Sequence, residues 1–177
     1  MKIYILRHGI ADDAQGNQPD SERALTPEGK KKLRIVLRAA HAAGVIPSLI
    51  LSSPYRRAVQ TAQLAAEALD YQGEVLETKT LEPASHPRVV WEEIRVHKDE
   101  PQLLLSGHEP LFSSLTAFLL GSPGLQIDFK KGAMACVEID HFPAEPHGIL
   151  KWMLTPKLAS TSDTNSMTPR LSKPKSF

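Results

Sequence analysis

The chain has 177 residues, enough for one domain with a buried core and short for two. Its formal net charge of +1 gives no electrostatic argument for nucleic acid or a membrane surface as partner, so an anion site must come from a local cluster of charge. A single cysteine, Cys136, excludes an intrachain disulfide, and the first apolar run breaks too early, at Arg7, for a signal peptide. We therefore expect a cytoplasmic protein.

The first half of the chain alternates strand and helix signals. Residues 2–6 form an apolar run typical of a buried strand. The segment "ALTPEGKKKLRIVLRAAHAAG" predicts a helix that Thr26 caps and Gly44 ends, with Pro27 at its first position. Its expected apolar stripe is Leu33, Val36, Leu37, Ala40 and Ala43. A second strand, "SLILSS", leads straight into a helix that begins near Pro54, with Val59, Ala62, Ala66 and Leu69 facing inward.

The second half continues the alternation and then changes character. "GEVLET" and "QLLLS" predict strands, and "RVVWEEIRVH" and "PLFSSLTAFLLG" predict helices. "GAMACVEID" and "GILKWML" follow as two successive strands. This order predicts a three-layer α/β domain over residues 1–158, with a mostly parallel sheet, helices on both faces and a C-terminal antiparallel strand or hairpin. Residues 159–177, rich in Ser, Thr, Pro and Lys, are expected to form a flexible tail.

Basic and hydroxyl side chains follow three of the predicted strands. The first strand ends in Arg7-His8-Gly9, the second in Ser52-Ser53-Pro54 with Arg56 and Arg57 just beyond, and a later one in Ser106-Gly107-His108. Ligands of open α/β sheets bind beyond the carboxyl ends of the strands, so these groups should meet at one edge. Arginines, histidines and a helix N-terminus suit a compact dianion such as a phosphate group.

Other phosphatase chemistries fail on the sequence. A cysteine-nucleophile enzyme needs an arginine at a set distance after the cysteine, where this chain has Phe142. No Walker loop is present, and His108-Glu109 is not followed by the second histidine of a zinc-binding helix. Asp12-Asp13 is a lone acidic pair and weak support for Mg²⁺. We expect no metal and no cofactor, which leaves histidine as the nucleophile.

These motifs resemble a known family. "LRHG", "SSPYRRAVQTA" and "SGHEP", in this order, are similar to those of the histidine phosphatase superfamily, which includes the phosphoglycerate mutases. The short chain and the ending "KKGAMACVEI…LKWMLTP" look most like the SixA-type phosphohistidine phosphatase branch. The resemblance covers the chain from Met1 to about Pro156.

The resemblance implies a role for each residue that matches a motif. His8 would be the nucleophile that is transiently phosphorylated, with Arg7 beside it on the phosphate. Arg57 would be the second phosphate-binding arginine, because it directly precedes an alanine in an Arg-Ala-x-x-Thr pattern, and Arg56 would lie at the rim. His108 would donate to a phosphate oxygen. Gly9 would let the backbone pass close to the phosphate, and Ser53 would cap its helix or contact the anion.

The proton donor for the leaving group is left open by the sequence. Mutase-like members of the family use a glutamate, which the SixA-type branch lacks. Glu82, in "LEPASHP", is a candidate general acid, although an ordinary loop carboxylate would look the same. Four further candidates have no positive support, and they are Asp12, Asp13, His86 and Glu109.

The leading prediction is therefore a metal-independent phosphatase that removes phosphate from phosphohistidine on a signalling or phosphotransfer protein. The first alternative is a phosphatase of a small phosphate ester, favoured if Glu82 points at His8. A phosphoglycerate mutase is less expected, because the chain is short for the usual capping segments. A phospho-binding module without turnover is the remaining alternative. Such a module would lack one of the four residues expected to act on the phosphate, and this chain has all four, which are Arg7, His8, Arg57 and His108.

Overall fold

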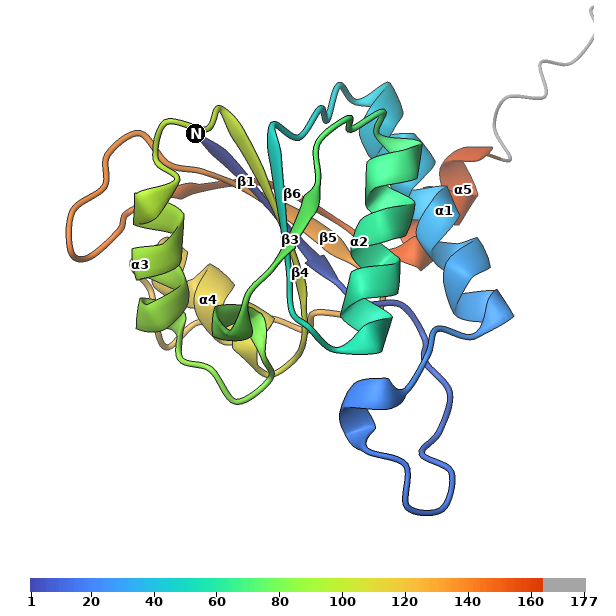
Figure 1. The fold of residues 1–177 in the computed structure, drawn as a ribbon. Coiled ribbons are helices and arrows are strands. Elements are labelled where there is room, and N and C mark those ends of the chain that lie inside the picture. Colours follow the sequence, from blue (N-terminus) through green and yellow to red (C-terminus); the bar gives the residue numbers. More distant parts are fainter. Residues whose placement is uncertain (164–177) are drawn as a thin grey trace, which may run out of the picture.

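The computed structural model describes residues 1–163, which form one sheet covered by helices on both faces (Figure 1). Along the chain the elements are β1 (Lys2–Arg7), the 3₁₀ helix η1 (Asp20–Glu22), α1 (Pro27–Ala42), β2 (Leu49–Ser52), α2 (Arg56–Ala68), β3 (Val75–Glu77), the 3₁₀ helix η2 (Lys79–Leu81), α3 (Pro87–Val96), β4 (Gln102–Gly107), α4 (Leu111–Leu119), β5 (Met134–Glu138), β6 (Ile149–Leu154) and α5 (Pro156–Asp163).

The sheet has the strand order β3-β2-β4-β1-β5-β6. The first four strands of the chain are parallel to one another, whereas β5 runs antiparallel to β1 and pairs with β6 as an antiparallel pair. This confirms the predicted fold class, including the C-terminal hairpin. Because β1 lies in the middle of the sheet, residues that follow it are flanked by protein on both sides.

Alternate residues of the central strands enter two separate cores. Ile3 and Ile5 of β1 pack with α3 and α4 on one face, and Tyr4 and Leu6 pack with α1 and α2 on the other. The side chains of β1 are thus buried on both faces, as expected of a central parallel strand. This double burial fixes the end of β1, and with it the position of His8.

Two helices differ in detail from the prediction. α1 has the predicted cap, since the Thr26 side chain accepts a hydrogen bond from the Gly29 N–H, but Ala43 is exposed. α2 begins at Arg56, later than predicted, and no side chain caps it. Its fully buried face contains Ala58 and Ala65 in place of the predicted Val59 and Ala66, which are half-buried. The buried face of α2 therefore contains several alanines, whose small side chains let the helix lie close to β2 and β4.

The C-terminal prediction needs a correction. Residues 159–163, predicted as the start of a flexible tail, belong to α5, and Ala159 is only 2% exposed because it packs in the same core as α1. The remaining residues of the predicted tail, 164–177, lie outside the described residues. Within residues 1–163, none of the helices has the length and apolar character that a membrane span requires.

Candidate active site

Three strand ends meet at the carboxyl edge of the sheet. Arg7 at the end of β1 is paired with Gly107 at the end of β4, and the His8 N–H donates to the Gly107 carbonyl at 2.9 Å. On the other side of β4, the Ser53 N–H donates to the Ser106 carbonyl at 2.9 Å. The backbone ladder therefore brings His8, Ser53 and His108 together, as the strand-end argument predicts.

The His8 ring is held in one orientation by its neighbours. His8 is 7% exposed, and its Nδ1 lies 2.7 Å from the carbonyl oxygen of Gly9. A carbonyl only accepts, so Nδ1 carries the proton and Nε2 keeps its lone pair. Burial, assisted by the charges of Arg57 and Arg7, lowers the pKa of His8 from 6.5 to about 3. The ring is thus neutral near pH 7, with its proton on Nδ1 and its lone pair on Nε2.

Arg57 faces that nitrogen. Its Nε–H donates to His8 Nε2 at 3.2 Å, and the guanidinium is 5.0 Å from the centre of the Tyr55 ring. Two further N–H groups donate to Asp20, one to its carbonyl at 2.6 Å and one to its carboxylate at 2.9 Å. Arg57 is 5% exposed, so a cation is buried at the edge of the sheet. Arg56, by contrast, is exposed.

Arg7 approaches the site from the end of β1. One terminal nitrogen of its guanidinium donates to the carbonyl of Phe129 at 2.5 Å. Burial lowers the pKa of Arg7 from its ordinary value, and the carboxylates of Glu109 and Asp128 oppose that shift. The positive charge of Arg7 acts on both His8 and His108, whose pKa values it helps to lower.

His108 lies beside His8, with ring centres 5.0 Å apart. Its Nε2 is 2.8 Å from the Ser53 hydroxyl, which also accepts the Tyr55 N–H at 3.3 Å. In this hydrogen bond either the Ser53 hydroxyl or the His108 Nε2 can be the donor, so the His108 proton can lie on Nδ1 or on Nε2. Burial is the main reason why the pKa of His108 falls from 6.5 to about 3. Ser53 thus orients His108 and is not the predicted helix cap.

Two buried polar atoms of the site have no hydrogen-bond partner. Across residues 1–163, the buried side-chain nitrogens and oxygens left without one are Arg7 Nε and His108 Nδ1. Buried polar groups are nearly always paired, because an unpaired one costs about 1–3 kcal/mol. Arg7 Nε is an N–H donor, and so is His108 Nδ1 when the Ser53 hydroxyl donates to Nε2. An oxyanion would satisfy them.

Gly9 contributes through its lack of a side chain. A Cβ on Gly9 would lie 2.6 Å from Cδ1 of Leu33 and 3.2 Å from the Gly29 carbonyl oxygen, so a side chain here would crowd α1. Its backbone is not in the left-handed region. The Gly9 N–H also donates to the Thr61 hydroxyl at 3.4 Å, which ties this turn to α2. The glycine is therefore explained by packing against α1 and α2.

The candidate acids are not joined to His8. The Glu82 side chain is half-buried and makes no hydrogen bond or ion pair within the described chain. Glu109 accepts the Ser113 N–H at 2.8 Å in the first turn of α4. Exposed His86 accepts the Arg88 N–H at the start of α3. Asp12 and Asp13 are exposed. Among residues 1–163, no three His, Cys, Asp or Glu side chains gather as metal ligands.

Asp20 is the residue that sequence reasoning missed. It belongs to η1, in the loop that joins β1 to α1 and hangs below the sheet in Figure 1. Its side chain is 54% exposed and also pairs with Arg23 at 2.8 Å. Hydrogen bonds from Arg23 and Arg57 hold the pKa of Asp20 below its ordinary value, against the opposing effect of partial burial. The only available signal was a long loop at the ligand edge of the sheet.

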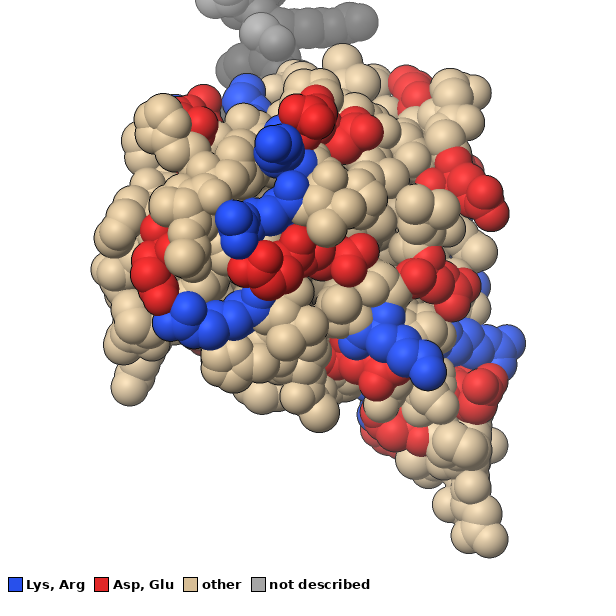
Figure 2. Space-filling model, turned by 60° about the vertical axis from the view of Figure 1, so that its left-hand side comes forward, with Lys and Arg blue, Asp and Glu red and all other residues tan. Residues whose placement is uncertain are grey.

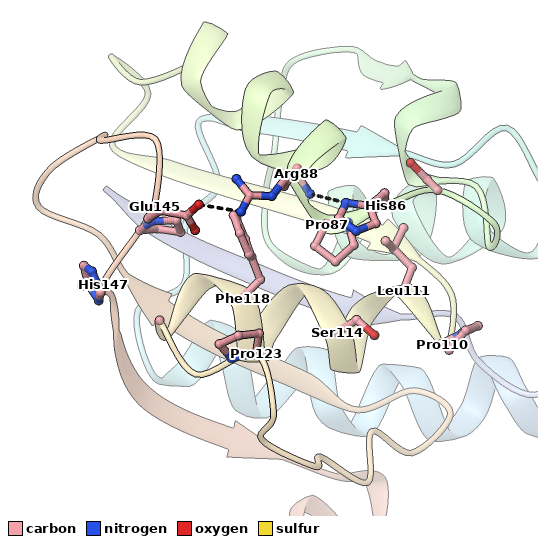
Figure 3. Close-up of a pocket in the computed structure, with 13 residues that line it drawn as sticks. His86, Pro87, Arg88, Pro110, Leu111, Ser114, Phe118, Pro123, Glu145 and His147 are labelled. Carbon is pink, nitrogen blue, oxygen red and sulfur yellow. Dashed lines mark hydrogen bonds and ion pairs between the residues drawn. The ribbon is translucent and has the colours of Figure 1, made fainter.

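A hollow of about 690 Å³ lies beside the site, between α3, α4 and the loop before β6 (Figure 3). Its floor contains Phe118 and Leu111, and the ion pair of Arg88 with Glu145 spans its rim at 2.5 Å. The hollow thus presents an apolar floor with one charge of each sign above it, and has no net preference for anions.

Comparison with known proteins shows to which family the chain belongs. The family model of the histidine phosphatase superfamily (branch 1) matches residues 3–83. An uncharacterised protein of Picosynechococcus sp. is 31% identical over 136 residues, which is 76% of this chain and 82% of the relative. With its central parallel sheet and its RHG strand end, the chain belongs to the histidine phosphatase superfamily.

Within the superfamily, the similarity to one relative is extensive. The phosphohistidine phosphatase SixA of Escherichia coli K12 is 27% identical over 158 residues, 88% of this chain and 94% of the relative. A solved structure of the protein histidine phosphatase SixA, complexed with tungstate, superimposes with a TM-score of 0.79 and covers 89% of this chain and 98% of that one. The chain is similar to SixA over nearly its whole described length.

Proposed function

We propose that the chain is a phosphatase that uses His8 as its nucleophile and hydrolyses phosphohistidine on a protein. The observation that carries this proposal is the neutral His8 ring, whose Nε2 lone pair faces Arg57 while its Nδ1–H is held by Gly9. The unpartnered Nε of Arg7 and Nδ1 of His108 support an oxyanion beside that lone pair. Tungstate, which the SixA structure binds, is a tetrahedral oxyanion of the same shape as phosphate.

The reaction follows from these groups. Nε2 of His8 attacks phosphorus, the bond from phosphorus to the substrate nitrogen breaks, and the phosphoryl group is transferred to His8. Arg7, Arg57 and His108 donate to the equatorial oxygens, where the charge of the transition state is spread. Water then attacks phosphorus, the bond to Nε2 breaks, and inorganic phosphate leaves with His8 neutral again.

The surroundings of the candidate general acids, Glu82 and Glu109, favour phosphohistidine over a phosphate ester as the substrate. An ester releases an alkoxide, which needs a general acid within hydrogen-bond reach. The Glu109 carboxylate accepts the Ser113 N–H, and the Glu82 carboxylate makes no hydrogen bond or ion pair within residues 1–163. An imidazole that takes up a proton from solvent leaves as a neutral ring, so the same site suffices without a dedicated acid.

A substrate comparison tests the proposal. The purified chain, without added metal, is offered a phosphohistidine peptide and a panel of phosphate esters, next to a His8→Asn variant and a His86→Asn control. We expect turnover of the phosphohistidine peptide by the wild type and the control, and none by His8→Asn. Ester turnover with no action on phosphohistidine would move the function to small esters. Full activity of His8→Asn would overturn the nucleophile.

A further inference from the structure

A second hollow, of about 840 Å³, begins at Arg7 on the opposite side of the site from that of Figure 3. Its lining comes from the turn after β1, from α1, from the loop before β5 and from the start of α5. We call it the cationic hollow, because its charged lining residues are Arg7, Lys32, Lys130, Lys131 and Lys157. Arg7 belongs both to this hollow and to the site around His8.

The charge of the cationic hollow is only partly neutralised. Lys32 pairs with Glu28 and Lys130 pairs with Asp128, each at 2.6 Å. Lys131 and Lys157 are exposed and form no ion pair within residues 1–163. Among residues 1–163, no acidic side chain lines the hollow. Its surplus positive charge is therefore held by Lys131, Lys157 and Arg7.

The uncharged lining is suited to a polypeptide. Ile10, Pro156 and Thr155 also line the hollow, so apolar side chains share it with the cations. Lysine stems add further apolar area beneath their ammonium groups. A different face of the molecule, over α3 and its neighbours, mixes Lys and Arg with Asp and Glu (Figure 2). A nucleic acid needs an extended stripe of positive charge, whereas the charged lining of the hollow is five cations, two of which are already ion-paired. The positive charge is local, as a short peptide segment requires.

We propose that the cationic hollow binds an acidic segment of the phosphorylated protein, next to the residue whose phosphate enters the site. The proposal rests on the proposed function in naming the substrate as a protein. Carboxylates of the segment would pair with Lys131 and Lys157, and its apolar side chains would lie on Ile10 and Pro156. Since Arg7 is shared, a chain seated in the hollow would present its phosphoryl group to His8.

The kinetic test uses two phosphohistidine peptides that differ only in flanking residues, Asp and Glu in one and Asn and Gln in the other. We expect the wild type to have about a tenfold lower KM for the acidic peptide, equivalent to two modest ion pairs. The variant Lys131→Glu/Lys157→Glu should lose this preference, so that its KM values for the two peptides are equal. The control Lys2→Glu/Lys98→Glu, with the same change of net charge away from the hollow, should keep it. Equal KM values in the wild type would overturn the proposal.

A binding test separates this proposal from the proposed function. The acidic peptide without phosphate, carrying a fluorescent label, is titrated with the wild type and both double variants. If the Lys131→Glu/Lys157→Glu variant alone loses binding, the proposal for the cationic hollow is supported even if no phosphohistidine is hydrolysed. Binding that is lost equally in the control, or that a single-stranded oligonucleotide displaces more strongly than the unlabelled peptide, would overturn it.

Discussion

The pocket at the strand ends and the loop that carries Asp20 are built in different ways. His8, Arg57 and His108 are between 1% and 7% exposed, and backbone bonds of β1, β2 and β4 fix the residues around them. Asp20 reaches Arg57 from a connection whose only helical turn is η1, and its side chain is 54% exposed. The pocket is thus preorganised by the sheet, whereas the loop contributes a surface ion pair.

This contrast predicts the size of mutational effects. A preorganised donor acts in a site without bulk water, so its loss is expensive. An ion pair with an exposed partner contributes about 0–1 kcal/mol, because solvent screens it. Changes in the pocket should therefore reduce activity by orders of magnitude, and changes in the loop by only a fewfold.

The largest difference in kcat/KM should be between variants of two adjacent arginines. Arg57→Ala removes a buried donor that faces His8 Nε2, and we expect kcat/KM to fall by about 10²–10³-fold. Arg56→Ala, the matched control at the exposed neighbour, should stay within about twofold. Steady-state kinetics on the phosphohistidine peptide measure both. The reverse pattern would mean that the phosphate binds to the other arginine.

Substitution of His108 should reduce kcat/KM more than substitution of Ser53. His108→Ala removes a buried ring whose Nδ1 has no hydrogen-bond partner, and about 10²-fold of kcat/KM should be lost. Ser53→Ala leaves the ring in place and removes its hydroxyl partner, so about tenfold should be lost. Equal losses, or a larger one for Ser53→Ala, would show that the serine contacts the phosphate itself.

The two neutral histidines should make the fold sensitive to acid. Both have a pKa of about 3 in the folded chain, against 6.5 when exposed, so the unfolded state binds more protons between these values. Their contribution to stability is complete above pH 6.5 and is lost as the pH falls toward 3. Each should add up to about 1.4 kcal/mol per pH unit to the slope of the unfolding free energy.

Denaturant titrations between pH 6.5 and pH 4.5 measure that slope. We expect His8→Asn and His108→Asn each to reduce it, whereas His86→Asn, at an exposed position, should leave it unchanged. Slopes that are the same in all four proteins would mean that both rings titrate normally in the folded chain.

The smallest effect should come from the loop. Asp20 accepts two of the Arg57 N–H groups that a phosphate would use. Asp20→Asn removes the negative charge, so KM for the peptide and the inhibition constant of inorganic phosphate should fall by about two- to fivefold. Asp13→Asn, exposed in the same loop, is the control. A rise in both constants would instead make Asp20 a support that positions Arg57.

Much of the pocket follows from local signals in the sequence. Apolar runs that stop at Arg7, Ser52 and Gly107 mark strand ends, and the parallel arrangement then requires the residues after them to share one edge. The Thr26 cap and the turn at Gly44 likewise depend on neighbours in the chain. Such features are readable because few distant residues influence them.

The features that were missed depend on tertiary contacts. The approach of Asp20 to Arg57 requires a loop without periodicity to fold back on the sheet. Residues 159–163 of α5 were predicted as tail, because their polar sequence hides one buried position, Ala159. Serine is a residue type typical of helix caps, yet the Ser53 hydroxyl is hydrogen-bonded to His108, which is distant in sequence. In each case the partner could not be known from the local pattern.

The most direct test of His8 as nucleophile is to trap the phosphorylated protein. The chain is mixed with a radiolabelled phosphohistidine peptide, quenched within milliseconds in base, and fragmented to locate the label. The account predicts an acid-labile, base-stable phosphate on His8 in the wild type and in His86→Asn, and none in His8→Asn. Rapid wild-type turnover with label on another residue, or with no labelled protein at any time, would contradict it.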